Sequence, residues 1–327
     1  MPLTPPKFWD NPKSCLGYLF EPLSWLYQGG AALHQKISKP HKASVPVISI
    51  GNFVLGGAGK TPVTIALAQE LQQMGWNPHI ISRGYGGSLR GPIQVDLAYH
   101  QFRQVGDEPL LLAKVAPTWI SKNRQAAVNL AIQSGADLLL LDDAHQNHSL
   151  EKDISLVVVN AAQGFGNGRV FPAGPLRLSV QAGLKNTTIL VFIGQDTDPL
   201  PKELTTFKCP LVRANIVPLN PQPCAVLAFT GIGYPEKFRQ TLVEAGYQVK
   251  GFSPFPDHYP FTNEDLDRLK TRARLAEASL ITTEKDAIRI PPIGRADIFT
   301  LAMRLDFYPK NALQDLLKQY LVPLKKK

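Results

Sequence analysis

Apolar residues recur along the chain with the spacing of alternating strands and helices. Short apolar runs predict buried strands at residues 45–50, 78–82, 138–141, 154–159 and 188–193. Between the first two runs, residues 61–74 have helical spacing and end at Gly75. Strands that alternate with helices form mostly parallel sheets with helices on both faces, so we expect an α/β fold of that kind.

The same pattern starts again after a proline-rich stretch. Residues 217–223 contain three Pro, which is typical of a linker. Beyond it the pattern predicts strands at 225–229, 248–252 and 279–282 and helices at 236–245 and 263–275. We therefore expect a larger domain over residues 45–217, a hinge at 218–223 and a smaller α/β lobe over 224–327.

Residues 1–44 form a third, N-terminal segment. Leucines and aromatic residues recur at helical spacing between residues 14 and 42, and Pro22 predicts a kink or two short helices. Lysines lie on both sides of this stretch, so the amphipathic helical segment could pack on its own domain or lie on an anionic membrane surface. The segment alone does not decide between these alternatives.

Composition narrows the class of protein. The chain has 327 residues, 44% of them hydrophobic and 19% charged, which excludes a disordered or fibrous protein. The net charge of +9 attracts anions: nucleotides, nucleic acid or an acidic membrane face. The three cysteines lack metal-ligand spacing, and no apolar run reaches the ~18 residues of a spanning helix. We expect a cytoplasmic protein, soluble or bound to a membrane surface.

A glycine-rich turn between the first strand and the first helix carries the strongest local signal. Glycines let backbone amides close around phosphate oxygens, and the helix N-terminus adds partial positive charge. Lys60 would reach the β- and γ-phosphates of ATP, and the Thr61 hydroxyl would bind Mg²⁺. The strict phosphate-loop pattern has Gly where this chain has Val54. The nucleotide-binding residues are predicted to be Val54, Leu55, Gly56, Gly57, Ala58, Gly59, Lys60 and Thr61.

Two pairs of acidic residues lie next to predicted elements. Asp142 and Asp143 come directly after the apolar strand at 138–141, where a phosphate-loop protein holds Mg²⁺. Asp107 and Glu108 precede a predicted helix at 110–116, where they could simply favour the helix N-terminus. If His258 of the smaller lobe crosses the cleft to Asp107, the pair could take a proton from an acceptor hydroxyl.

Several sequence blocks, taken in order, resemble the tetraacyldisaccharide 4′-kinase family, the lipid A 4′-kinases. They extend from about residue 46 to 290, and the N-terminal stretch 22–27 resembles the family's membrane-associated helix. The blocks are residues 51–52 with 56–62, 82–86, 106–109, 142–143, 164–169, 172–177, 231–233, 257–259 and 282–287.

The resemblance implies a P-loop NTPase-like fold and a specific reaction. ATP would phosphorylate the 4′-hydroxyl of a tetraacylated glucosamine disaccharide 1-phosphate, giving lipid IVA at the cytoplasmic face of the bacterial inner membrane. It implies that Asp107 is the base, paired with His258, and that Lys60 is also catalytic. The implied Mg²⁺ ligands are Thr61, Glu108, Asp143 and Asp142, and the implied substrate residues are Asn52, Arg83, Tyr85, Gln146 and Arg177.

One block departs from the family pattern. The family usually has Asp-Asp-Gly-Phe-Gln-His, whereas residues 142–147 read Asp-Asp-Ala-His-Gln-Asn. The imidazole expected at Asn147 is absent. Either a neighbouring histidine, His145 or His148, replaces it, or turnover is reduced, and the sequence does not decide between these alternatives.

Two other functions remain open at this point. A membrane-associated P-loop ATPase switch would hydrolyse ATP in response to a protein partner, and the sequence names no such partner. A GTPase is disfavoured because residues 283–286 have the guanine-recognition element in the wrong order. Nucleic-acid binding is suggested only by the net charge, without a helix-turn-helix, a zinc signature or an aromatic-basic repeat, so we expect no nucleic-acid partner.

Overall fold

The computed structural model describes residues 6–205 and 207–325 of the chain. The parts of the predicted N-terminal segment and smaller lobe that fall on residues 1–5 and 326–327 lie outside the described residues.

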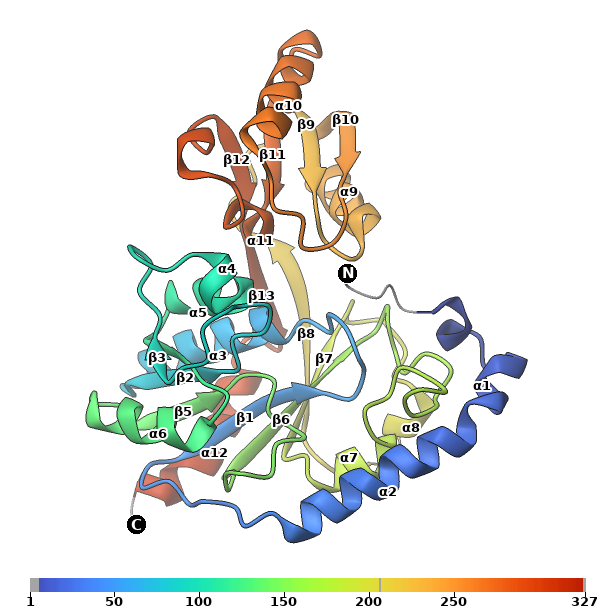
Figure 1. Ribbon diagram of the computed structural model, residues 1–327, viewed down its shortest axis with the longest axis vertical. Coiled ribbons are helices and arrows are strands. Elements are labelled where there is room, and N and C mark those ends of the chain that lie inside the picture. The colour runs from blue at the N-terminus through green and yellow to red at the C-terminus, as the bar shows by residue number, and fades with distance from the viewer. Residues whose placement is uncertain (1–5, 206, 326–327) are drawn as a thin grey trace.

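A nine-stranded sheet forms the larger lobe (Figure 1), in the order β13-β8-β7-β6-β1-β5-β2-β4-β3. Only the pairs β13–β8 and β3–β4 are antiparallel among the described strands. This confirms the predicted mostly parallel sheet. The strands are β1 (Val47–Asn52), β2 (Pro78–Ser82), β3 (Ile93–Gln94), β4 (Thr118–Ile120), β5 (Leu138–Leu141), β6 (Ile154–Asn160), β7 (Ile189–Ile193), β8 (Leu211–Pro218) and β13 (Met303–Tyr308).

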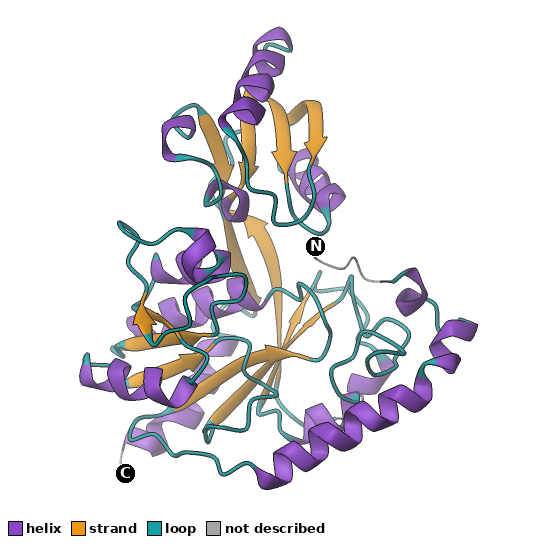
Figure 2. Cartoon of the chain, in the orientation of Figure 1, coloured by secondary structure: helices purple, strands orange, loops and turns teal. Residues whose placement is uncertain are grey.

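Helices cover both faces of this sheet (Figure 2), because its central strands are buried on both sides. One face packs against α3 (Lys60–Gln73), α5 (Asp107–Ala113) and α12 (Ala312–Lys325). The other packs against α6 (Arg124–Gln133) and α7 (Val180–Lys185). Three shorter helical turns complete the lobe: η1 (Lys7–Asp10), α4 (Phe102–Val105) and α8 (Lys202–Thr205).

The smaller lobe is a four-stranded parallel sheet in the order β10-β9-β11-β12. Its strands are β9 (Ala225–Thr230), β10 (Gln248–Pro254), β11 (Ser279–Thr283) and β12 (Ile298–Leu301). Its helical elements are α9 (Pro235–Glu244), α10 (Asn263–Leu275), α11 (Glu284–Ala287) and η2 (Pro292–Gly294).

The connection between the lobes differs from the sequence prediction. The chain leaves the large sheet through β8 and returns to it through β13, so two antiparallel strands join the lobes (Figure 1). The smaller lobe was expected to extend to residue 327, yet Leu313, Leu317 and Leu321 of α12 are buried in the core of the larger lobe. The sequence pattern does not show this return, because a strand that rejoins the large sheet has the same pattern as a strand of the smaller α/β lobe.

Two helices run along the outside of the larger lobe before the first strand (Figure 1). They are α1 (Cys15–Leu19) and α2 (Glu21–Ile37), and Pro22 lies in the first turn of α2, where no backbone donor is lost. Ser24 fixes α2 to the body of the protein, since its hydroxyl donates to the Val170 carbonyl at 2.7 Å. Within the described residues, no helix is long and apolar enough to span a bilayer.

Candidate active site

The glycine-rich turn lies at the carboxyl end of β1 and leads into α3. Gly59 has φ +90°, and a Cβ there would lie 2.6 Å from Cδ1 of Ile193, so the turn needs glycine at this position. Val54 is buried and bridges to Leu176. The departure from the strict motif therefore places an apolar side chain in the core beneath the loop.

The backbone of this loop is open to a ligand. Among the described residues, no hydrogen bond occupies the amides of Gly57, Gly59 and Lys60. They lie at the N-terminus of the 14-residue helix α3. Unpaired amides at a helix N-terminus favour anions, and phosphate is the usual one.

Lys60 projects from the first turn of α3 toward two polar groups. Its Nζ lies 3.3 Å from Oδ1 of Asn52 and 3.6 Å from Oδ1 of Asp143. Asn52 is buried and donates to the Val54 carbonyl at 2.7 Å, while Gln146 donates to the Asn52 carbonyl at 2.8 Å. Asn52 and Gln146 were expected to contact substrate, but in this structure their amide groups brace the phosphate loop.

Asp142 and Asp143 follow β5 near this loop, and the two carboxyl groups have different partners and opposite pKa shifts. Asp142 is buried and accepts from Thr64 and Ser82. Burial, together with the neighbouring carboxylates of Asp143 and Glu108, raises the pKa of Asp142 to about 6. Burial also works against ionisation of Asp143, but the charges of Lys60 and Arg177 outweigh it and lower the pKa of Asp143.

The four predicted Mg²⁺ ligands are carboxylates and a hydroxyl, which are the hard oxygen donors that Mg²⁺ prefers. Burial is the main cause of the raised pKa of Asp142, and the neighbouring carboxylates of Asp143 and Glu108 add negative charge that a cation would relieve. Glu108 pairs instead with Lys285 of α11, with Nζ and Oε1 2.9 Å apart. In the described part of the chain, no three His, Cys, Asp or Glu side chains form a metal site by themselves. The donor set fits an ion whose remaining ligands come from nucleotide phosphates and water.

The structure brings Asp107 and His258 together from opposite lobes. His258 Nδ1 lies 2.8 Å from Asp107 Oδ2. Asp107 starts α5, because Gly106 before it has φ +90° and no room for a Cβ, which would lie 2.4 Å from the Tyr85 carbonyl oxygen. We expected residues 106–109 to be a loop before the helix, but Asp107 and Glu108 occupy its first turn. Carboxylates are stabilised there by the helix dipole.

A third side chain, Arg289, completes this cluster. Its guanidinium donates from Nε to Asp107 Oδ2 at 3.0 Å and also from Nη2 to the same oxygen. Burial works to raise the pKa of Asp107, but the hydrogen bond from His258 and the hydrogen bonds and charge of Arg289 outweigh it and lower the pKa to about 2. Asp107 is therefore an ionised carboxylate, and Nδ1 of His258 carries the proton that it donates.

The two oxygens of Asp107 have different surroundings. His258 and Arg289 both donate to Oδ2. Within the described residues, no hydrogen bond reaches Oδ1. One oxygen is thus anchored while the other is free to accept from a ligand.

The remaining predicted substrate residues differ in their exposure and in their hydrogen bonds. Arg83 and Tyr85 are exposed on the loop after β2. Arg177 is half-buried and donates from both terminal nitrogens to the two oxygens of Asp143, each at 3.2 Å. Only exposed groups such as Arg83 and Tyr85 present their side chains to a ligand without rearrangement.

The structure answers part of the question raised by the altered block at residues 142–147, which lacks an imidazole at Asn147. His145 is buried in the core, where its ring nitrogens contact Ser155 Oγ at 3.0 Å and the Gly183 carbonyl at 3.2 Å. Burial lowers the pKa of His145 to about 4. His145 therefore cannot replace the imidazole missing at Asn147. His148 is half-buried, and burial and nearby Lys152 lower its pKa.

Sequence reasoning missed two buried arginines. Arg289 was not considered, although a charged residue between Ile288 and Ile290 in an apolar run signals a buried ion pair. Arg124 of α6 was also missed. It donates to the backbone carbonyls of Asp142 and Asp143 at 3.2 and 3.0 Å and so fixes the turn that presents the two acids.

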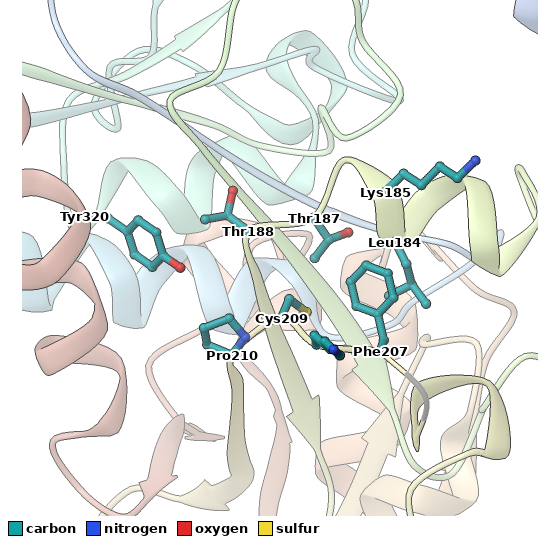
Figure 3. A pocket seen from close by; sticks show the side chains of 9 residues that line it. Leu184, Lys185, Thr187, Thr188, Phe207, Cys209, Pro210 and Tyr320 are labelled. Atoms are coloured by element: carbon teal, nitrogen blue, oxygen red, sulfur yellow. The ribbon is translucent and has the colours of Figure 1, made fainter.

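A separate cavity of about 660 Å³ lies away from these residues (Figure 3). It is lined by the end of α7, the starts of β7 and β8, and Tyr320 of α12. The phosphate loop lies at the carboxyl ends of the parallel strands, which is the edge where α/β proteins bind ligands. The cavity lies at the opposite edge and does not belong to the candidate active site.

Comparison with known proteins shows which proteins this chain is similar to. The tetraacyldisaccharide-1-P 4′-kinase family model matches residues 16–322. A tetraacyldisaccharide 4′-kinase from Paramagnetospirillum magneticum is 42% identical over 316 residues, covering 95% of this chain and 97% of the relative. One from Jannaschia sp. is 44% identical over 308 residues, covering 92% of this chain and 94% of the relative.

A solved structure extends the comparison to the fold. The crystal structure of the "apo" form of LpxK from Aquifex aeolicus, in complex with ATP, matches with a TM-score of 0.77 and 26% identity. The match covers 93% of this chain and 99% of that chain. The predicted resemblance and the predicted P-loop NTPase-like α/β fold are both confirmed. The chain belongs to the tetraacyldisaccharide-1-P 4′-kinase family and is a phosphotransferase of lipid A biosynthesis.

Proposed function

We propose that this kinase transfers the γ-phosphoryl group of ATP to the 4′-hydroxyl of a tetraacylated glucosamine disaccharide 1-phosphate. The observation that carries the proposal is the pairing of Asp107 with His258 across the two lobes, in a protein whose phosphate loop is open. Such a pair serves an acceptor hydroxyl, whereas an ATPase switch requires only a positioned water. Family membership also does not favour the switch.

The phosphate loop holds the donor. The free amides at Gly57, Gly59 and Lys60 bind phosphate oxygens, and the Lys60 ammonium neutralises charge on the β- and γ-phosphates. Thr61, Asp142, Asp143 and Glu108 are the residues that would hold Mg²⁺. The ion would neutralise developing charge on the phosphates. For Glu108 to join it, the ion pair with Lys285 must open.

Asp107 handles the acceptor. Its free oxygen, Oδ1, accepts a hydrogen bond from the 4′-hydroxyl and orients that oxygen toward the γ-phosphorus. As the new P–O bond forms, the bond from the γ-phosphorus to the β-phosphate bridging oxygen breaks, ADP leaves, and the hydroxyl proton passes to Asp107. A carboxylate with a pKa of about 2 is a weak base, so the proton moves late, as suits a loose phosphoryl-transfer transition state.

His258 completes the acceptor site from the smaller lobe. It holds Asp107 Oδ2 in place through Nδ1. Its Nε2 lies 3.8 Å from Oδ2 of Asp257, within the same loop of the smaller lobe. Because His258 belongs to the smaller lobe and Asp107 to the larger one, approach of the two lobes assembles the acceptor groups near the phosphate loop. It also excludes water that would otherwise hydrolyse ATP.

The N-terminal helices are proposed to bind an anionic inner-membrane surface at its cytoplasmic face. Leu19, Trp25 and Leu26 are 70%, 65% and 73% exposed. Leu19 ends α1, and Trp25 and Leu26 lie on α2; large exposed apolar side chains on neighbouring helices, with lysines nearby, are typical of an interfacial segment. Attachment there would place the active site close to an acylated substrate.

The proposal is tested by following the label from γ-³²P-ATP in the presence of a bacterial lipid extract. Label in a chloroform-soluble sugar lipid supports the kinase, and label released only as inorganic phosphate supports the ATPase switch. A Lys60→Ala variant, which lacks the phosphate-binding ammonium, is the control for contaminating kinases.

A further inference from the structure

Arg289 is a deeply buried charged side chain near the site. It is 2% exposed and lies just after α11 in the smaller lobe. Its Nη1 donates to the Gly231 carbonyl at 2.8 Å and to Oδ1 of Asp286 at 3.3 Å. A buried guanidinium is tolerated only when its donors are paired, and here they are paired on two sides.

The side of Arg289 that faces its own lobe is rigid. Asp286 is fully buried and accepts from the hydroxyl of Thr230 at 2.6 Å, the hydroxyl of Thr283 at 2.7 Å and the amide of Gly231 at 3.0 Å. The carbonyl of Gly231 accepts from Arg289 and also from the backbone amide of His258, at 3.0 Å. Arg289 and His258 are therefore fixed to the same peptide group.

The other side of Arg289 crosses to the larger lobe. Nε and Nη2 both reach Oδ2 of Asp107, the oxygen that also accepts from His258. The two nitrogens converge on this one oxygen instead of bridging both oxygens, so together with His258 they fix the position of Oδ2, which lies off the Cβ–Cγ axis. With Oδ2 held by Arg289 and His258, the rotation of the carboxyl group about its Cβ–Cγ bond is restricted and Oδ1 has a defined direction.

We propose that Arg289 is a positioning residue, which locks the Asp107 carboxylate against His258 when the lobes meet and so presents Oδ1 to the acceptor hydroxyl. This inference rests on the proposed function, because it assigns Arg289 a task in the same transfer. It requires that loss of Arg289 slow the transfer step without weakening ATP binding, since the guanidinium makes no contact with the phosphate loop among the described residues.

The first test compares Arg289→Ala with Arg295→Ala. Arg295 is a matched control from the same segment, because within residues 6–205 and 207–325 its hydrogen bonds go only to the carbonyls of Ile290 and Ile288, and none goes to Asp107 or His258. Arg289→Ala should lower kcat about 100-fold, with KM for ATP changed less than about 2-fold. Arg295→Ala should keep kcat within about 2-fold of the unmodified protein, whatever its melting temperature. Equal kcat values for the two variants would overturn the proposal.

Chemical rescue separates positioning from a general loss of packing. Arg289→Ala removes a fully buried guanidinium and leaves a space of matching shape beside Asp107. Millimolar guanidinium, well below denaturing concentration, should raise kcat of Arg289→Ala about 10-fold and leave Arg295→Ala unaffected. Lack of rescue together with a KM for ATP raised 10-fold or more would assign Arg289 a purely structural role.

A double-mutant comparison keeps the proposal testable if Arg289→Ala does not fold. Arg289→Lys keeps the charge but has all its donors on a single nitrogen in place of the three nitrogens of the guanidinium, and it should lower kcat at least about 10-fold. The same substitution made in an Asp107→Ala background should lower kcat less than 2-fold further, because the group to be positioned is gone. A full additional loss in that background would contradict positioning. If the unmodified protein itself transfers no label to lipid, the proposed function fails and not this inference alone.

Discussion

Nδ1 of His258 lies 2.8 Å from Oδ2 of Asp107, although 151 positions separate the two residues in the sequence. Asp107 starts a helix of the larger lobe, and His258 lies on a loop of the smaller lobe at φ +60°. Neither residue by itself would indicate a catalytic site. Their meeting means that the acceptor site exists only when the two lobes are together, which ties chemistry to lobe closure.

The first prediction concerns this pair as a unit. Asp107→Ala and His258→Ala should each lower kcat by about 10² to 10⁴, the range for loss of a general base or its partner. Because each variant destroys the same arrangement, the double variant should be little slower than the slower single variant. Steady-state kinetics of phosphate transfer to lipid measures this. Losses that multiply would show that the two side chains act separately.

The second prediction concerns Lys60. Lys60→Ala removes the ammonium that lies 3.6 Å from Asp143 and faces the phosphate loop, so kcat/KM for ATP should fall about 100-fold or more. Circular dichroism should be unchanged, since the Lys60 ammonium contacts the polar groups of Asn52 and Asp143 and not the apolar core. Lys237→Ala, which removes an exposed lysine of α9, is the matched control and should retain full activity. Unaltered nucleotide affinity in Lys60→Ala would move the ATP site elsewhere.

The third prediction is a pH dependence of stability set by His145. The pKa of His145 is lowered from 6.5 to about 4 in the folded protein, mainly by burial. Between pH 6.5 and 4 the unfolded chain binds a proton that the folded protein refuses, so stability falls as the pH falls through this window. The linkage amounts to roughly 3 kcal/mol at and below pH 4 and vanishes above about pH 7.

His145→Phe tests that linkage. Its neighbours keep other partners, because Ser155 Oγ accepts from Ser49 at 3.2 Å and the Gly183 carbonyl accepts from Thr187 at 2.9 Å. Urea unfolding at pH 7 and pH 4.5 should show a smaller loss of stability on acidification in the variant than in the unmodified protein. An identical loss in both proteins would mean that His145 titrates normally.

The fourth prediction concerns the exposed face of α1 and α2. A triple variant, Leu19→Ser with Trp25→Ser and Leu26→Ser, should weaken binding to vesicles containing anionic lipid about 100-fold, on the order of 3 kcal/mol of apolar transfer. These side chains are exposed, so the fold should persist. The control replaces Leu275 and Ile293 by Ser, which are exposed apolar residues of the smaller lobe. Equal vesicle binding by both variants would place the membrane contact elsewhere.

The strands at 78–82 and 138–141 and the helix at 263–275 match their predicted bounds, because uninterrupted apolar runs and clear helical periods depend on local sequence. Strand β13 (Met303–Tyr308) was missed since Phe307 is its only buried residue and it pairs with a strand far away in the chain. Register with a distant partner leaves no local pattern.

The site was predictable to a similar degree. The phosphate loop and the acids after β5 could be recognised from the local sequence, because each directly follows a predicted strand. These strands, β1 and β5, are parallel neighbours, so the loop and the acids lie at the same edge of the sheet. Asn52 and Gln146 were predicted as substrate contacts, and that prediction stays untested; the structure adds that their amide groups brace the phosphate loop. Arg289 stayed hidden, because its importance arises only from contact with Asp107 across the lobes.

The most direct test of the account uses purified protein, γ-³²P-ATP, Mg²⁺ and a tetraacylated glucosamine disaccharide 1-phosphate in mixed micelles. Thin-layer chromatography and mass spectrometry of the product locate the new phosphate. The account predicts one added phosphate on the 4′-oxygen, with transfer reduced at least about 100-fold in Asp107→Ala. Release of labelled phosphate to water with no labelled lipid, or transfer at full rate by Asp107→Ala, would contradict it.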